Sequence, residues 1–270
     1  MSEADKVFAG SIPENYDRYL VPLIFESFAH DMAQRAAELS PSAVLETAAG
    51  SGVVTRALTP RLSPDASYVV TDLNQPMLDY AATRQGTDNR ISWRKADALA
   101  LPFEDASFDL VCCQFGVMFF PDRQSGYREA KRVLRPGGCF LFNVWDRIEE
   151  NVFANDVTNA LAEVFPSDPP RFLARTPHGY HDPALIHREL DRAGFSSVVI
   201  ETRADQSRAF SPRQPAVAYC QGTPLRNEIE ARDPAKLQAA TDYAASRIAN
   251  RHGSGEVAAK IQAHVIVAVA

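Results

Sequence analysis

The first half of the chain alternates short apolar runs with stretches of helical periodicity. Apolar side chains from Phe25 to Ala36 recur at the i, i+3, i+4 and i+7 spacing, which predicts a helix that ends near Ser40-Pro41. Strands are predicted at the apolar runs 43–45, 68–71, 91–94, 108–113 and 140–145, and helices at 53–58, 74–84 and 124–134. This alternation is typical of a parallel sheet covered on both faces, so we predict an α/β, doubly wound fold.

The second half departs from this alternation. Asp182, Pro183 and Gly194 are typical of the cap, first turn and end of a helix, and strands are predicted at 198–200 and 262–270. Between these two strands, residues 211–252 are predicted to be helical. Residues 147–181 show no clear period beyond a helix near 152–164. Segments of this size inside a compact domain are more typical of a lid or substrate wall than of bare loops.

Charge and cysteine content narrow the class of partner. The formal net charge is −6 and no dense basic run is present, which disfavours binding to nucleic acid. The most continuous apolar stretch, Val265–Ala270, is too short to span a membrane, and no signal peptide is predicted. Since Cys112, Cys113, Cys139 and Cys220 form no C-x-x-C pair, we predict buried thiols in a cytoplasmic protein.

The turn after the first predicted strand carries candidate binding chemistry. Gly50 and Gly52 let a backbone approach a ligand closely, but dinucleotide enzymes use the same device. Thr55 stands where the dinucleotide fingerprint needs Gly or Ala. The carboxylate of Glu46 would repel a pyrophosphate and attract an ammonium or sulfonium group. These residues favour S-adenosylmethionine over a dinucleotide, and a generic tight turn is the competing interpretation.

Two further acids follow the next strands. Asp72 lies 20 residues after Gly52, and an acid at the end of that strand accepts hydrogen bonds from ribose hydroxyls. A helix cap or surface turn is the alternative. Asp97 could accept from an adenine amino group, with the amide of Ala98 as a donor to the ring. An Asx-turn explains Asp97 equally well.

An ordered set of motifs resembles a known family. The set comprises residues 44–52 (VLETAAGSG), Asp72, residues 97–103 (DALALPF), residues 107–111 (SFDLV) and residues 132–138 (RVLRPGG). It is similar to class I S-adenosylmethionine-dependent methyltransferases, above all to the branch of the ubiquinone/menaquinone C-methyltransferases and many small-molecule enzymes. The resemblance covers about residues 40–146. One departure is Ala48-Ala49, where the family often has Gly-Cys; both alanines are small enough to keep the turn.

The resemblance implies a Rossmann-like sheet of seven strands whose last strand is antiparallel, and it implies roles for single residues. Glu46, Ala48, Gly50 and Gly52 would hold the methionine part of the cofactor, and Asp72 the ribose. The adenine would contact Leu73, Met77, Asp97 and Ala98. Gln114 and Phe115 would lie beside the transferable methyl group. In similar enzymes an aromatic N-terminal segment, here including Tyr16, folds over the cofactor; packing of the tyrosine rings is an equal alternative.

These expectations divide the chain by function. Residues 1–40 form an N-terminal helical cap over the cofactor site, and residues 41–146 form the S-adenosylmethionine-binding core. Segments 147–181 and 203–260 are substrate-side lid insertions, and 182–202 and 261–270 complete the core sheet. The predicted activity is transfer of a methyl group to a small-molecule acceptor by in-line displacement. No nucleic acid or metal is expected, and a homodimer is possible.

A catalytic base is needed only if the acceptor must lose a proton, because methyl transfer otherwise requires mainly alignment. His178, Tyr180 and His181 are candidates, although the helix cap at Asp182 explains His181 and Asp182 without catalysis. Two other functions compete: an NAD(P)-dependent oxidoreductase, and a cofactor-binding subunit without catalysis. No motif identifies the acceptor or distinguishes C-, O- and N-methylation.

Overall fold

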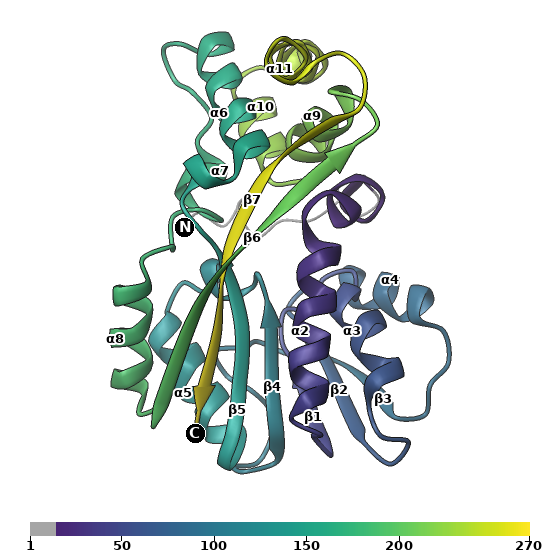
Figure 1. Ribbon diagram of the computed structural model, residues 1–270, viewed down its shortest axis with the longest axis vertical. Helices are drawn as coiled ribbons and strands as arrows, with labels where there is room; N and C mark the ends of the chain where they lie inside the picture. Colours follow the sequence, from purple (N-terminus) through teal and green to yellow (C-terminus); the bar gives the residue numbers. More distant parts are fainter. Residues whose placement is uncertain (1–14) are drawn as a thin grey trace. The chain divides into compact units, whose positions relative to one another are not determined.

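A seven-stranded sheet organises the chain in the computed structural model, which describes residues 15–270 (Figure 1). Its strand order is β3-β2-β1-β4-β5-β7-β6. Strands β1 to β5 pair in parallel. β7 is antiparallel to β5, since Ala270 pairs with Gly138 and Gln262 with Asp146. The bounds are β1 (Ala43–Glu46), β2 (Ser67–Asp72), β3 (Ile91–Lys95), β4 (Phe108–Gln114), β5 (Leu134–Trp145), β6 (Ser197–Ala209) and β7 (Val257–Val269). The predicted doubly wound, mostly parallel sheet is confirmed.

The chain forms two compact units. The sheet unit contains Glu26–Val144, His181–Thr202 and His264–Ala270. Of the described residues, the helical unit contains 15–25, Trp145–Tyr180 and Arg203–Ala263. Strands β6 and β7 contribute residues to both. Residues 1–14 of the predicted N-terminal cap, residues 1–40, lie outside the described residues. In the rest of this segment, residues 15–25 belong to the helical unit and α2 (Glu26–Glu38) to the sheet unit, and its role as a cap stays a prediction.

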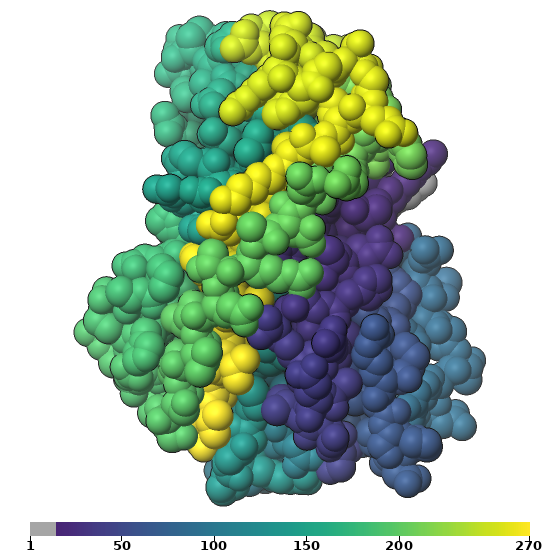
Figure 2. Space-filling view, in the orientation of Figure 1, coloured from purple at the N-terminus to yellow at the C-terminus, as the bar shows by residue number. Residues whose placement is uncertain are grey.

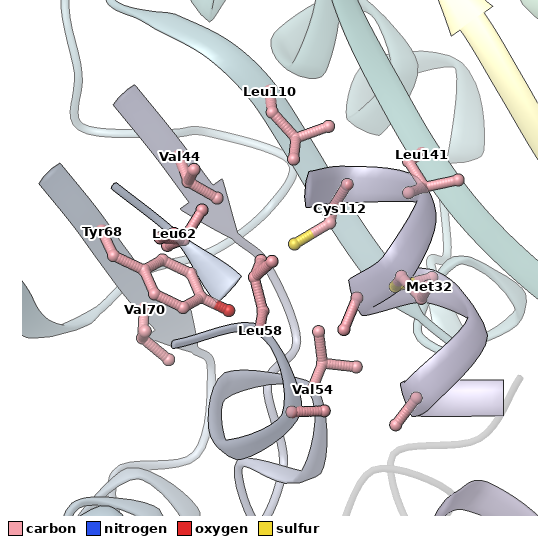
Figure 3. Close-up of a cluster of buried hydrophobic side chains, with 14 of the residues drawn as sticks. Met32, Val44, Val54, Leu58, Leu62, Tyr68, Val70, Leu110, Cys112 and Leu141 are labelled. Atoms are coloured by element: carbon pink, nitrogen blue, oxygen red, sulfur yellow. The ribbon is translucent and has the colours of Figure 1, made fainter. Parts of the chain in front are cut away.

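Helices cover both faces of the sheet unit. On one face, α2 and α3 (Val53–Leu58) pack on a buried cluster (Figure 3) that includes Met32, Leu58, Tyr68, Cys112 and Leu141. On the other face, Tyr127 of α5 (Arg123–Val133) contacts Phe140 and Phe142 of β5. Leu141 and its two neighbours face opposite sides because side chains alternate along a strand. The remaining helices of this unit are η3 (Thr59–Arg61), α4 (Gln75–Gln85), η4 (Val117–Phe119) and α8 (Pro183–Ala193).

The helical unit is built around α11 (Leu237–His252), which packs against α6 (Val152–Val164) and α9 (Arg213–Gln221) and lies on the unit's surface (Figures 1 and 2). The buried carboxylate of Asp156 on α6 binds both Arg251 and His252 at the end of α11. The other helices are η2 (Tyr16–Phe25), η5 (Ile148–Glu150), α7 (Phe172–Arg175), α10 (Leu225–Arg232) and η6 (Pro234–Lys236). The helices predicted within 211–252 and near 152–164 are confirmed. The role of these segments as a lid stays a prediction.

Three strands are longer than the sequence pattern predicts. β5 begins at Leu134, where the predicted helix 124–134 ends, and includes Pro136-Gly137-Gly138, which lie before the predicted strand 140–145. β6 continues to Ala209 through charged residues, and β7 begins at Val257. Pairing with β7 supplies the backbone hydrogen bonds that a short apolar run does not reveal. The four cysteines, all within the described residues, are buried free thiols, as predicted.

Candidate cofactor site in the sheet unit

The turn after β1 adopts an unusual backbone. Gly50 and Gly52 have positive φ angles of 57° and 78°, and Ala48 also has a positive φ, 53°. A Cβ atom on Gly52 would lie 2.9 Å from the Cβ of Ala81 on α4, so only glycine fits there. The amide of Ala49 donates to the carbonyl of Thr71 at 3.0 Å, which fixes the turn to β2.

Asp72 closes this turn from the end of β2. Its Oδ2 accepts from the Gly50 amide at 2.8 Å, and its Oδ1 accepts from the Asn74 amide at 2.8 Å. The residue is only 7% exposed, and burial raises its pKa above the ordinary value while these amides oppose the shift. Its Oδ1 also accepts from Asn74 Nδ2 at 3.4 Å. Because a carboxylate accepts about four hydrogen bonds, one position remains for a ligand hydroxyl.

An apolar surface adjoins Asp72. Leu73 is 45% exposed although it follows a buried acid. Met77 reaches the turn: its Cε would lie 3.8 Å from a Cβ atom on Gly50. A carboxylate beside exposed apolar surface fits a sugar that carries a flat ring. The assignment of Leu73 and Met77 to adenine stays a prediction.

Glu46 lies beneath the turn with its carboxyl group in the core, where the residue is 2% exposed. Its Oε2 accepts from Thr55 Oγ1 at 2.6 Å and from the Tyr68 hydroxyl at 2.5 Å (Figure 3 shows this hydroxyl in the buried cluster). Burial raises the pKa of Glu46 to about 7, against the opposing influence of these two donors and of Arg56. Glu46 thus has two protein partners that the sequence did not indicate, and its contact with a ligand ammonium stays a prediction.

At the end of β3, Asp97 forms the Asx-turn that the sequence offered as the alternative to adenine binding. Asp97 is exposed, and its Oδ1 accepts from the Leu99 amide at 2.9 Å, which is an Asx-turn. Ala98 is half-buried. The Asx-turn does not use every acceptor position of the Asp97 carboxylate. Contact of Asp97 and Ala98 with adenine therefore stays a prediction.

The end of β4 lies against the turn after β1. Phe115, which follows Gln114, has a positive φ of 50°, and its amide donates to Oδ1 of Asn143 at 3.0 Å. A Cβ atom on the next residue, Gly116, would lie 2.6 Å from the Cβ of Ala48. This contact brings the ends of β1 and β4 together at the point where the strand order reverses, which is where ligands bind in open α/β sheets.

The remaining candidates lie at or near the helical unit. The Tyr16 ring stacks on Phe25 with centroids 5.1 Å apart, which is the packing alternative; its contact with a cofactor stays a prediction. His178 and Tyr180 are buried there, and Nδ1 of His178 lies 2.8 Å from the carbonyl oxygen of Asp146. His181 belongs to the sheet unit and precedes Asp182, which caps α8 by accepting from the Ala184 amide at 2.9 Å. The predicted helix cap is confirmed, and catalysis by the three candidates stays untested.

Sequence reasoning missed two buried polar side chains at this site. Within residues 15–270, the Ser51 hydroxyl and the Asn143 Nδ2 are buried and have no hydrogen-bond partner. Ser51 lies in the turn itself, so its hydroxyl is suited to a polar ligand. The serine between two motif glycines was a signal in the sequence. Asn143 lies inside an apolar strand and was overlooked for that reason.

The sheet order and the turn define the fold of class I S-adenosylmethionine-dependent methyltransferases. Residues 45–142 match the family described as a methyltransferase domain. A solved structure of similar fold is a putative methyltransferase from Bacillus halodurans, at 20% identity and a TM-score of 0.59, with 90% of this chain and 98% of that chain covered.

Curated relatives are similar over the same region. A ubiquinone/menaquinone biosynthesis C-methyltransferase from Hahella chejuensis is 37% identical over 103 residues, which is 37% of this chain and 41% of the relative. A demethylmenaquinone methyltransferase from Deinococcus radiodurans is 38% identical over 132 residues, 47% of this chain and 54% of the relative. The chain thus spans about half the length of the curated relatives it matches.

No helix within residues 15–270 has the length and apolar character needed to cross a membrane. In the same residues, no three His, Cys, Asp or Glu side chains are grouped as metal ligands would be.

Proposed function

We propose that the protein transfers a methyl group from S-adenosylmethionine to a small-molecule acceptor. The observation that carries this proposal is the contact of Asp72 with Gly50, which joins the ribose-binding position to the turn expected to hold the methionine part. Both residues lie inside the segment that matches the methyltransferase domain. The name of one curated relative, a C-methyltransferase, favours a carbon as the methylated atom.

The chain's own residues fit the parts of this cofactor in order. Leu73, Met77, Asp97 and Ala98 would contact the adenine, and Asp72 the ribose hydroxyls. The turn from Ala48 to Gly52, with the unpaired Ser51 hydroxyl, would bind the methionine part, and Glu46 would support it from below. Gln114 and Phe115 would lie nearest the methyl group.

When bound, S-adenosylmethionine supplies a methyl group on a sulfonium sulfur. The protein's main contribution is to hold the acceptor in line with that group and to exclude water. The strained backbone at Ala48 and Phe115 supports this role, because strain persists where the surrounding structure fixes a geometry. No step here requires His178, Tyr180 or His181.

The competing functions lack specific support. Thr55 occupies the position at which a dinucleotide fingerprint requires Gly or Ala. The Thr55 hydroxyl donates a hydrogen bond to Glu46. A carboxyl group beneath the turn disfavours a pyrophosphate above it. No observation in the described residues favours a subunit without catalysis.

A thermal-shift panel separates the leading function from the oxidoreductase. We expect S-adenosylmethionine and S-adenosylhomocysteine to raise the Tm of the full chain, because a ligand that binds only the folded state stabilises it. NADH and NADPH should leave the Tm unchanged. A shift with a nicotinamide dinucleotide alone would refute the proposal.

A further inference from the structure

Asn143 carries an unexplained polar group. It lies near the carboxyl end of β5, is 1% exposed, and stands between the fully buried Phe142 and Val144. Its Oδ1 accepts from the Phe115 amide at 3.0 Å, and in residues 15–270 its Nδ2 has no partner. The Phe115 N–H also donates to the backbone carbonyl of Asn143 at 3.2 Å. A flipped side-chain amide would place its NH2 group about 3.0 Å from this N–H, so that two donors would face each other, and the orientation with Oδ1 toward Phe115 is favoured. A buried donor left unpaired costs about 1–3 kcal/mol.

The hydrogen bond to the Phe115 amide accounts for Oδ1 of Asn143 but not for its Nδ2. Phe115 has a strained positive φ, and Oδ1 of Asn143 helps to hold its amide. An oxygen alone would serve that purpose, whereas asparagine brings two further N–H donors into an apolar strand. Buried polar groups without a partner call for an explanation, and a ligand that the structure does not contain is one.

The strand order indicates which part of a bound ligand would lie nearest Asn143. Along the sheet, Asp97 follows the end of β3 at Lys95, Asp72 ends β2, the glycine turn follows the end of β1 at Glu46, and Gln114 ends β4. On the proposed function, this order follows the cofactor from its adenine to its methyl group. β5 is the next strand, and Asn143 is paired in register with Gln114. Asn143 therefore lies one strand beyond Gln114 and Phe115, the residues expected nearest the methyl group, which makes it a candidate contact for the acceptor.

We propose that the Asn143 amide donates a hydrogen bond to an oxygen of the methyl acceptor. The inference rests on the proposed function and makes it more specific: the acceptor carries a carbonyl, hydroxyl or phenolate oxygen close to the atom that is methylated. A donor at that oxygen orients the acceptor and stabilises negative charge on it. Asn143 is a substrate-binding residue in this account and takes no proton.

A crystal structure of the full chain with S-adenosylhomocysteine tests the placement. We expect Nδ2 to lie beyond hydrogen-bond distance, about 3.5 Å, from every atom of S-adenosylhomocysteine, and to bind a water molecule in the space beside the sulfur. A hydrogen bond from Nδ2 to the carboxylate of S-adenosylhomocysteine would overturn the inference, and so would an Nδ2 that stays buried with no water molecule within about 3.5 Å. Failure of S-adenosylhomocysteine to bind at all would instead overturn the proposed function.

Two matched variants test the unpaired donor in solution. N143D keeps an oxygen for the Phe115 amide and replaces the NH2 group with a second carboxyl oxygen. N151D makes the same change at Asn151, another buried asparagine, whose Nδ2 is within 3.2 Å of three carbonyl oxygens. We expect N143D to lower the Tm less than N151D and to change the S-adenosylhomocysteine dissociation constant less than threefold. Equal losses of Tm, or a tenfold loss of affinity in N143D, would contradict the proposal.

Discussion

Asp72 is the residue whose position and spacing allowed the most direct prediction from sequence. It follows a buried strand, lies 20 residues after Gly52, and is bonded to the Gly50 amide across the turn. Ser51, Asn143 and the partners of Glu46 could not be predicted in the same way. Tyr68 lies 22 residues from Glu46, and neither apolar periodicity nor motif spacing shows that two side chains so far apart are bonded.

Replacement of Asp72 should weaken cofactor binding. In D72A the charge-assisted contacts to the ribose hydroxyls are lost, and we expect the S-adenosylhomocysteine dissociation constant to rise more than about tenfold. Calorimetry on D79A is the control, because Asp79 is an exposed acid on α4. Similar affinities for D72A and D79A would contradict the role of Asp72.

The buried carboxyl of Glu46 should make stability depend on pH. Its ordinary pKa is 4.5 and burial raises this to about 7 in the folded protein. Between these values the unfolded chain loses the proton and the folded chain keeps it, so stability falls as the pH rises. The loss is about 3 kcal/mol at the full shift.

E46Q isolates this effect, because the amide oxygen still accepts from Thr55 and Tyr68 but does not titrate. In denaturant unfolding we expect E46Q to gain stability relative to the natural chain as the pH rises from 5 to 8. A difference that is constant over this range would show that Glu46 does not retain its proton on folding.

Because Ala48 and Gly116 are in close contact, we expect the size of the side chain at each position to be limited by the other. In G116A the new Cβ would lie 2.6 Å from both Ala48 Cβ and Cys113 Sγ, so we expect a loss of about 1–3 kcal/mol. Adding A48G removes one of the two close approaches and also relieves a positive φ of 53°. Denaturant unfolding of the double variant should recover part of the loss. Strict additivity of the two changes would mean that the residues do not interact.

Elements with local end signals were predicted well, and elements that depend on distant partners were not. α8 has a capping Asp182, a proline in its first turn and a left-handed Gly194 at its end, all visible in the sequence. β6 has an alternating, charged pattern and lies at the edge of the sheet, so only its pairing with β7 reveals its full length. The π-helix η2 contains Pro22, which supplies no amide donor, and its type was not predicted.

The hydrogen bond that caps α8 should contribute to stability but not to ligand binding. D182A removes the acceptor for the Ala184 amide and should cost about 1 kcal/mol of stability. Affinity for S-adenosylhomocysteine should not change. D191A, at the other end of α8, is the control for loss of a negative charge, and its stability should stay closer to that of the natural chain. Calorimetry and thermal unfolding check both variants; weaker ligand binding in D182A alone would give this end of α8 a role in the site.

For the whole molecule, the sequence predicts the sheet better than the helical unit. The methyltransferase match ends at residue 142, and Trp145–Tyr180 and Arg203–Ala263 fold as part of the helical unit. That these segments form the acceptor lid stays a prediction, as do a homodimer and a cytoplasmic location. Acceptor recognition is the least predictable property, because it depends on side chains outside any shared motif.

Calorimetric titration of the full chain with S-adenosylhomocysteine tests the central claim most directly. The account predicts one site per chain with a dissociation constant of about micromolar or tighter, and competition by S-adenosylmethionine. Absence of binding heat with both adenosyl ligands, under conditions where the chain is folded, would contradict it.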